Sequence, residues 1–200
     1  MYYTNNNVFE LSDFAIDANE CLEFRRGSMP PVMLDLRSTD EYHKSHISGA
    51  TSIPSEFLKD RMMMLPPFGK IIVYGGDDDE LTGESLKQLK EKGFEQLSYV
   101  RGGYSSLDEA IRNSDQEIRL SDIPREEWGQ KIEDVLDKKV RPALASDGGG
   151  LQVVKIENDT VFINYQGACN GCASAATGTL QFIKKSLSAT LNHEIEVIAA

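Results

Sequence analysis

The chain has 200 residues, of which 40% are hydrophobic and 26% charged, a composition typical of a soluble globular protein with one or two domains. Its formal net charge of -11 disfavours nucleic acids and anionic membranes as partners. The odd number of cysteines, three, argues against a disulfide framework. Neither a secretory signal nor an apolar run of about 20 residues is visible. We therefore expect a cytoplasmic protein that does not bind membranes.

Short apolar segments alternate with a helical pattern in the first half of the chain. Residues 32–36 and 71–74 are apolar runs bounded by proline, glycine and acidic residues, as in the buried strands of a parallel sheet. Apolar residues recur at helical spacing between 81 and 89, and residues 97–100 supply a further strand. This alternation predicts an α/β domain with crossover helices, which we place at residues 1–113.

A polar segment at residues 114–124 is interpreted as a linker, because it contains few apolar side chains and ends in a helix-start signal. We place a second domain at residues 125–200. Its first helix is predicted from an apolar stripe that runs from Trp128 to Val140. Pro142 should kink or end this helix, since proline lacks the backbone N–H that a helix interior uses.

The rest of the second domain has the pattern of a small α+β sandwich. Residues 151–156 and 160–165 predict two strands of a hairpin, and the three glycines at 148–150 predict a turn. A helix over residues 176–191 and a last strand over residues 194–198 complete the expected order of helix, hairpin, helix and strand.

Two cysteines lie in a glycine-rich run between the second hairpin strand and the following helix. Cys169 and Cys172 have the spacing with which two thiolates bind a soft metal centre or form a redox pair. The remaining cysteine, Cys21, lies far away in the sequence. Two cysteines are half of a four-thiolate site, so a closed site of that kind needs a second chain. The pattern therefore indicates a metal or redox site, and the ligand count favours one that two chains share.

The C-terminal part, from about residue 126 onward, resembles the NifU C-terminal, or Nfu-type, iron–sulfur domain. The matching motifs are Val-Arg-Pro at 140–142, Asp-Gly-Gly-Gly at 147–150 and Gly-Ala-Cys-Asn-Gly-Cys at 167–172. The resemblance implies a cluster carrier or scaffold in which Cys169 and Cys172 of two chains bind one bridging [4Fe–4S] cluster. It implies a homodimer when the cluster is bound, and apo iron–sulfur proteins and the cluster assembly machinery as partners. Ligand exchange with a target's cysteines needs no acid–base residue, so we expect no catalytic residues and no enzyme.

The N-terminal part resembles a rhodanese domain. The matching stretches are Leu-Asp-Leu-Arg-Ser-Thr-Asp-Glu-Tyr at 34–42, His-Ile-Ser-Gly-Ala at 46–50 and Gly-Gly at 102–103. In that family a catalytic cysteine follows the strand that corresponds to residues 71–74, and here this position is Gly75. The four acids at 77–80 would repel thiosulfate and would raise the pKa of a nearby thiol. We expect a degenerate rhodanese-like domain that serves as a docking module.

Three other readings of the cysteine pair remain open. The two thiols could be buried structural residues, a dithiol–disulfide couple, or ligands of zinc shared by two chains. The rival function is accordingly a dithiol–disulfide oxidoreductase or a protein related to sulfurtransferases. Gly167 and Gly171 are further candidates, because their backbone N–H groups could approach the sulfides of a cluster. For the glycines at 148–150 we expect only the role of a turn.

Overall fold

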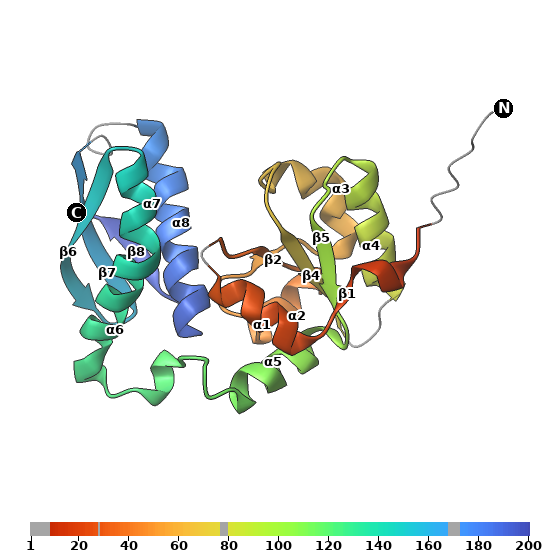
Figure 1. Cartoon of the computed structure of the whole chain (residues 1–200), viewed down its shortest axis with the longest axis horizontal. Helices are drawn as coiled ribbons and strands as arrows, with labels where there is room; N and C mark the ends of the chain where they lie inside the picture. Colours follow the sequence, from red (N-terminus) through yellow and green to blue (C-terminus); the bar gives the residue numbers. More distant parts are fainter. Residues whose placement is uncertain (1–8, 28, 77–79, 168–172) are drawn as a thin grey trace. The chain divides into compact units, whose positions relative to one another are not determined.

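The computed structural model describes residues 9–27, 29–76, 80–167 and 173–200, and for residues 173–177 the backbone alone. The chain divides into two compact units. The first comprises residues 1–24, 31–46 and 51–111, and the second residues 25–30, 47–50 and 112–200. Each unit contains its own β-sheet (Figure 1).

The first unit contains a five-stranded, all-parallel sheet with the strand order β1-β5-β4-β2-β3. The strands are β1 (Ala15–Ile16), β2 (Val32–Asp35), β3 (Thr51–Ser52), β4 (Ile71–Tyr74) and β5 (Leu97–Val100). The predicted strands at 32–36, 71–74 and 97–100 are thus confirmed as β2, β4 and β5. All four residues of β4 and of β5 are buried, because helices cover both faces of this sheet.

Alternate residues of these strands pack against different helices. Leu34, Val73 and Tyr99 are neighbours across the sheet and belong to one apolar cluster with residues of α3 (Leu58–Arg61) and α4 (Glu80–Glu91). The opposite face is covered by α1 (Ala18–Arg26) and α5 (Gly103–Asn113) (Figure 1). The parallel arrangement brings the carboxyl ends of β2 and β4 to the same edge of the sheet. At this edge lie the short helix α2 (Thr39–Lys44) and a 3-10 turn, η2 (Ser55–Phe57).

The second unit contains a helical stretch in three parts. The α-helix α6 (Trp128–Val135) continues into a π-helical turn, η6 (Leu136–Val140), and then into α7 (Arg141–Ser146). Pro142 therefore does not end the helix. It lies in the first turn of α7, where a backbone N–H would have no partner within that helix, and the wider π turn precedes it.

A three-stranded sheet with the order β6-β7-β8 covers one side of these helices. The strands β6 (Gly149–Glu157) and β7 (Thr160–Gly167) form the predicted hairpin, and β8 (Glu196–Ala199) pairs with β7 in parallel. The expected turn at 148–150 is wrong in part, because Gly149 and Gly150 are the first residues of β6 and pair with Gly167 and Gln166.

The long helix α8 (Ala173–Leu191) supplies the other half of the core of this unit. Its residues Ile183, Leu187 and Leu191 are fully buried in one apolar cluster, as the predicted helical stripe requires. Leu120, from the polar segment that precedes α6, is also fully buried in this cluster. In the described part of the chain, no helix is both long and apolar enough to span a bilayer.

Candidate functional site

The predicted ligands Cys169 and Cys172 lie outside the described residues. The elements on either side of them are described, however. Strand β7 ends at Gly167 and helix α8 begins at Ala173, so both cysteines belong to the five residues that connect this strand to this helix. The site can therefore be built from its frame: the end of β7, the start of α8 and the strand that pairs with β7.

Gly167 enters the connection in a backbone conformation that favours glycine. Its φ is +66°, in the left-handed region, and a Cβ atom at this position would overlap the carbonyl oxygen of Gly148. The pairing of Gly149 with Gly167 sets this close approach. The Asp-Gly-Gly-Gly segment at 147–150 and the beginning of the cysteine segment therefore lie at the same end of the sheet. The glycines thus do more than turn the chain, since they let two backbone segments approach closely at Gly167, the residue that precedes the cysteine segment in the sequence.

Arg141 ties this end of the sheet to the helical stretch. Its guanidinium donates to Glu133 in α6 at 2.8 Å and to Asp137 in η6 at 2.6 Å, and its Nε is 3.5 Å from the carbonyl oxygen of Leu151 in β6. Burial would lower the pKa of Arg141, but the hydrogen bonds and charges of the two carboxylates raise it above its ordinary value. The group stays charged, and it links α6, η6 and β6 through one side chain.

The remaining cysteine and the histidines take no part in this frame. Cys21 is fully buried in α1, and its sulfur is 3.9 Å from the sulfur of Met33. His46 stacks on the ring of Tyr42, and its Nδ1 is 2.9 Å from the carbonyl oxygen of Tyr42. Across residues 9–27, 29–76, 80–167 and 173–200, no group of three or more His, Cys, Asp and Glu side chains could hold a metal ion.

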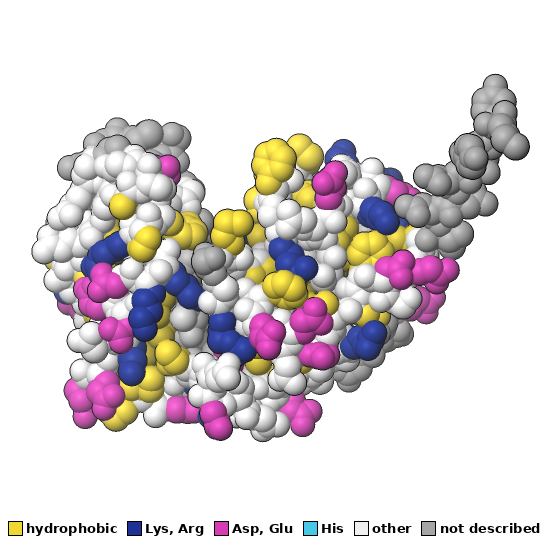
Figure 2. Space-filling view, in the orientation of Figure 1, with side chains coloured by type: hydrophobic (Ala, Val, Ile, Leu, Met, Phe, Trp, Pro, Cys, Tyr) yellow, Lys and Arg dark blue, Asp and Glu magenta, His cyan; other side chains and the backbone are white. Residues whose placement is uncertain are grey.

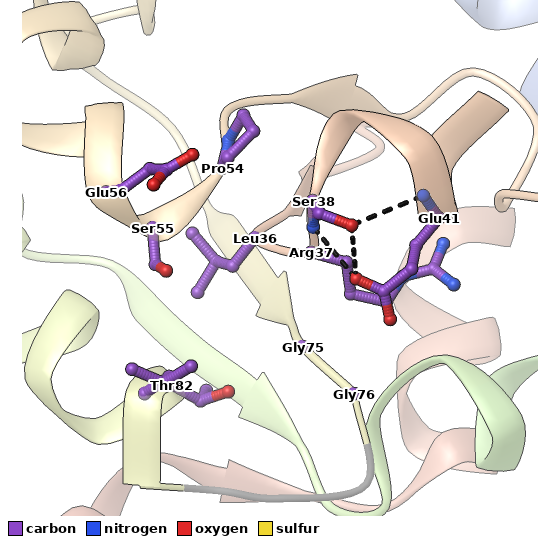
Figure 3. A pocket seen from close by; sticks show the side chains of 11 residues that line it. Leu36, Arg37, Ser38, Glu41, Pro54, Ser55, Glu56, Gly75, Gly76 and Thr82 are labelled. Atoms are coloured by element: carbon purple, nitrogen blue, oxygen red, sulfur yellow. Dashed lines mark hydrogen bonds between the residues drawn. The ribbon is translucent and has the colours of Figure 1, made fainter.

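The first unit has a separate hollow of about 360 Å³ at the carboxyl ends of its strands (Figure 3). Parallel sheets commonly bind ligands at this edge. The described lining comes from the ends of β2 and β4, from α2 and η2, and from the start of α4. It includes Leu36, Arg37, Ser38, Glu41, Pro54, Ser55, Glu56, Gly75, Gly76, Leu81 and Thr82. Gly75, which the resemblance stated above aligns with a catalytic cysteine, is part of the pocket wall. Its carbonyl oxygen accepts the backbone N–H of Tyr104 at 3.0 Å.

An ion pair at the end of β2 holds the arginine of this pocket in place. The carboxylate of Asp35, which is fully buried, receives Nε and Nη2 of Arg37 at 3.0 and 2.6 Å. Nη2 also donates to the carbonyl oxygen of Ser45, and the guanidinium lies 4.0 Å above the ring of Tyr104. Burial would lower the pKa of Arg37, and the hydrogen bond and charge of Asp35 raise it above its ordinary value. Its charge is therefore satisfied within the protein.

Glu41 has a capping role beside the pocket. Its carboxylate accepts the hydroxyl and the backbone N–H of Ser38, and the Ser38 hydroxyl accepts the backbone N–H of Glu41, which makes a capping box at the start of α2. The hydrogen bond from the Ser38 hydroxyl lowers the pKa of Glu41 most, and the hydrogen bond from the Ser38 backbone N–H lowers it further. The sequence indicates Gly75 and the four acids at 77–80 but does not predict this pocket. The Ser-x-x-Glu pattern at 38–41 is a sequence signal for the capping box.

Comparison with known proteins identifies both halves. A NifU-like domain model matches residues 132–198, and a rhodanese-like domain model matches residues 18–110. The chain is 34% identical over 115 residues to the nitrogen fixation protein NifU of Anabaena sp. strain L31, an alignment that covers 57% of this chain and 97% of that protein. It is 33% identical over 79 residues to the mitochondrial NFU1 iron–sulfur cluster scaffold homolog of Drosophila persimilis, covering 40% of this chain and 27% of that protein.

Among solved structures, the chain is similar to the rhodanese-like domain of the Alr3790 protein from Anabaena sp. The sequence identity is 33%, the TM-score is 0.42, and the match covers 48% of this chain and 74% of that domain. Thus the chain spans almost the full length of one curated NifU relative and about a quarter of the Drosophila scaffold homolog.

Proposed function

Since this chain belongs to the NifU family and joins a NifU-like domain to a rhodanese-like domain, we propose that it carries an iron–sulfur cluster and delivers it to apoproteins. The proposed cargo is one [4Fe–4S] cluster that bridges two chains, bound by Cys169 and Cys172 of each. The observation that carries the proposal is the ligand count in the NifU-like domain, where two cysteines lie in the connection between β7 and α8. A [4Fe–4S] cluster is commonly held by four thiolates, so two chains supply what one lacks.

The frame of the connection supports thiolate ligands. Helix α8 begins at Ala173, directly after Cys172, and the positive end of a helix dipole lowers the pKa of a nearby thiol. The left-handed Gly167 and the adjoining Gly148 keep side chains away from the entry to the connection. An entry built from glycines favours exchange of the cluster with the thiolates of an acceptor protein.

The delivery step proposed here is ligand exchange. Cysteines of an acceptor replace Cys169 and Cys172 one after another, and the two chains separate when the bridging cluster has left. No proton has to be held at a fixed position for this, so the protein needs no catalytic residue. The odd number of cysteines fits a reducing compartment, and we place the activity in the cytoplasm.

The rhodanese-like unit is proposed to dock partners rather than to transfer sulfur. A persulfide intermediate needs a sulfur atom at the pocket, and position 75 is glycine. Cys21, the only cysteine of this half, is fully buried and lies on α1. The partners in this proposal are apo iron–sulfur proteins and the machinery that assembles the cluster.

Anaerobic reconstitution with iron and sulfide tests the proposal. We expect about four iron and four sulfide ions per two chains, with loss of both in Cys169→Ser and Cys172→Ser. Cys21→Ala is the matched control and should keep the full content, because its thiol is buried in the other unit. One zinc ion without sulfide would contradict the cluster, and a reversible Cys169–Cys172 disulfide in a protein that binds no iron would favour a dithiol–disulfide oxidoreductase.

A further inference from the structure

The pocket at the carboxyl ends of β2 and β4 in the rhodanese-like unit is lined by more acidic than basic side chains. Of the eleven lining residues that the structure describes, one is basic, Arg37, and its charge is already matched by Asp35 at 2.6 Å. Two are acidic, Glu41 and Glu56, and both are exposed. The net charge that the pocket offers to a ligand is therefore negative.

Glu41 keeps its charge at neutral pH, because the hydroxyl and backbone N–H of Ser38 stabilise its carboxylate form. In Figure 3 these hydrogen bonds hold Glu41 on one side of the hollow, whereas Glu56 lies on another side, beyond Leu36 and Pro54. A cation between these walls would meet carboxylates from two different segments of the chain.

Apolar side chains surround the acids. Leu81, on the pocket wall, is 65% exposed, and Phe57, which follows Glu56, is 41% exposed. Leu36 and Pro54 are buried and form part of the lining. Figure 2 shows exposed hydrophobic side chains of this unit interspersed with charged ones. Large exposed apolar groups next to charged ones are typical of protein docking sites.

We propose that this pocket binds a lysine or arginine side chain, flanked by apolar residues, from an extended segment of a client apoprotein. The inference rests on the docking role proposed above and names the chemistry that this docking uses. Glu41 and Glu56 attract the cationic head group from two sides of the hollow, and the exposed Leu81 contacts an apolar neighbour. The alkyl stem of the basic residue passes over Leu36 and Pro54, since long basic side chains bury their stems against apolar surface.

Charge complementarity decides between this occupant and a small anion. Among the lining residues that the structure describes, the one base is paired internally, and the carboxylates of Glu41 and Glu56 would repel thiosulfate or phosphate. A cation gains the attraction of two exposed carboxylates, and dissolved salt screens charges on an exposed surface. The attraction should therefore weaken as the salt concentration rises.

The test is a titration of the full-length apo chain, followed by the amide NMR signals of Gly75, Gly76, Leu81 and Thr82. The probe is an acetylated and amidated pentapeptide with a central arginine between two leucines and glycines at the ends. A peptide with glutamate in place of arginine is the matched control ligand, and thiosulfate is a third ligand. We expect saturable, salt-sensitive shifts of these signals with the arginine peptide and none with the glutamate peptide.

Two double variants test the assigned residues. Glu41→Gln with Glu56→Gln removes both charges, and glutamine can keep the capping box. We expect the Kd for the arginine peptide to rise about fivefold or more, as the loss of exposed ion pairs predicts. Glu84→Gln with Glu91→Gln, two exposed acids of α4 that line a different hollow, should leave the Kd unchanged.

Three results would overturn the inference: unchanged binding in the first double variant, an equal effect of the control variant, or shifts of the same signals with thiosulfate and not with the arginine peptide. None of them concerns cluster binding. Iron and sulfide contents of the first double variant should equal those of the wild type, so a failure of peptide binding is distinguishable from a failure of the carrier function.

Discussion

The glycine at the entry to the cysteine segment offers a sharp test of the frame. Gly167→Ala places a Cβ atom where φ is +66° and where that atom would overlap the carbonyl oxygen of Gly148. A residue other than glycine in the left-handed region costs about 1–2 kcal/mol. Relief of the overlap must move β7 away from β6, which weakens one or two backbone hydrogen bonds of about 1 kcal/mol each. We expect the free energy of unfolding of the NifU-like unit to fall by about 2–4 kcal/mol.

Urea unfolding of the full-length apo chain measures this change directly. Trp128 is the only tryptophan in the chain and is buried in the NifU-like unit, so its fluorescence reports on this unit. Gly150→Ala is the matched control at the same end of the sheet. A Cβ atom there would lie 3.6 Å from the Cβ atom of Gln166, an ordinary contact, and we expect a change within about 1 kcal/mol.

The same variant should bind less cluster, because the displaced end of β7 leads directly into the connection that carries both cysteines. Anaerobic reconstitution of Gly167→Ala under conditions in which the apo protein remains folded should give less iron and sulfide than Gly150→Ala. The reasoning is refuted if Gly167→Ala unfolds at the same urea concentration as the control and binds a full complement of iron.

Three further predictions concern the rest of the chain. Ser38→Ala should destabilise the rhodanese-like unit by about 1 kcal/mol at pH 7. In the folded protein the pKa of its partner Glu41 lies below the ordinary value of 4.5. The hydrogen bonds of the Glu41 carboxylate therefore stabilise the unit above pH 4.5, and this stabilisation is lost as the pH falls. Unfolding followed by circular dichroism should show that the variant loses less stability than the wild type between about pH 5 and about pH 3. Thiosulfate–cyanide sulfurtransferase activity should be at background because position 75 is glycine, and turnover that survives Cys21→Ala would contradict this. A fragment of residues 118–200 should fold alone with Trp128 buried, whereas one of residues 125–200, which lacks the fully buried Leu120, should be less stable by about 2 kcal/mol. An unfolded 118–200 fragment would contradict the proposed division into domains.

The elements with a clear apolar pattern were predictable from the sequence. The strands β2, β4 and β5 are short apolar runs, and their burial on both faces is what such runs indicate. The hairpin of β6 and β7 and the helix α8 follow alternation and helical spacing in the same way. For β6, β7 and α8 the pattern is long enough to distinguish the period of a strand from that of a helix, whereas β2, β4 and β5 are recognised by their short length and their polar, glycine or proline neighbours.

Other elements depend on contacts that no local pattern encodes. The strands β1 and β3 have two residues each, too few for a period, and exist because β5 and β2 offer them backbone partners. Gly149 and Gly150 form a strand because Gly167 and Gln166 lie opposite, although three glycines in a row favour a turn. At Pro142 the chain keeps its helical course through a π turn, a local adjustment that the sequence does not specify.

Some features of the candidate sites can be predicted from a short stretch of sequence, and others cannot. The spacing of Cys169 and Cys172 and the glycine at position 75 can be read from the sequence directly. The pocket beside Gly75 is assembled from four segments between Leu36 and Thr82, and the neutralisation of Arg37 by Asp35 requires the turn at the end of β2. These relations become visible only once the parallel sheet has brought the ends of its strands together.

If two chains share one cluster through Cys169 and Cys172, native mass spectrometry of the anaerobically reconstituted protein should detect a dimer whose mass exceeds that of two chains by one [4Fe–4S] cluster. Mixing with an excess of the Cys169→Ser, Cys172→Ser double variant should yield no cluster-bearing heterodimer, since such a pair has two thiolates where four are needed. A cluster on a single chain, or on the heterodimer, would show that the two chains do not share it in this way.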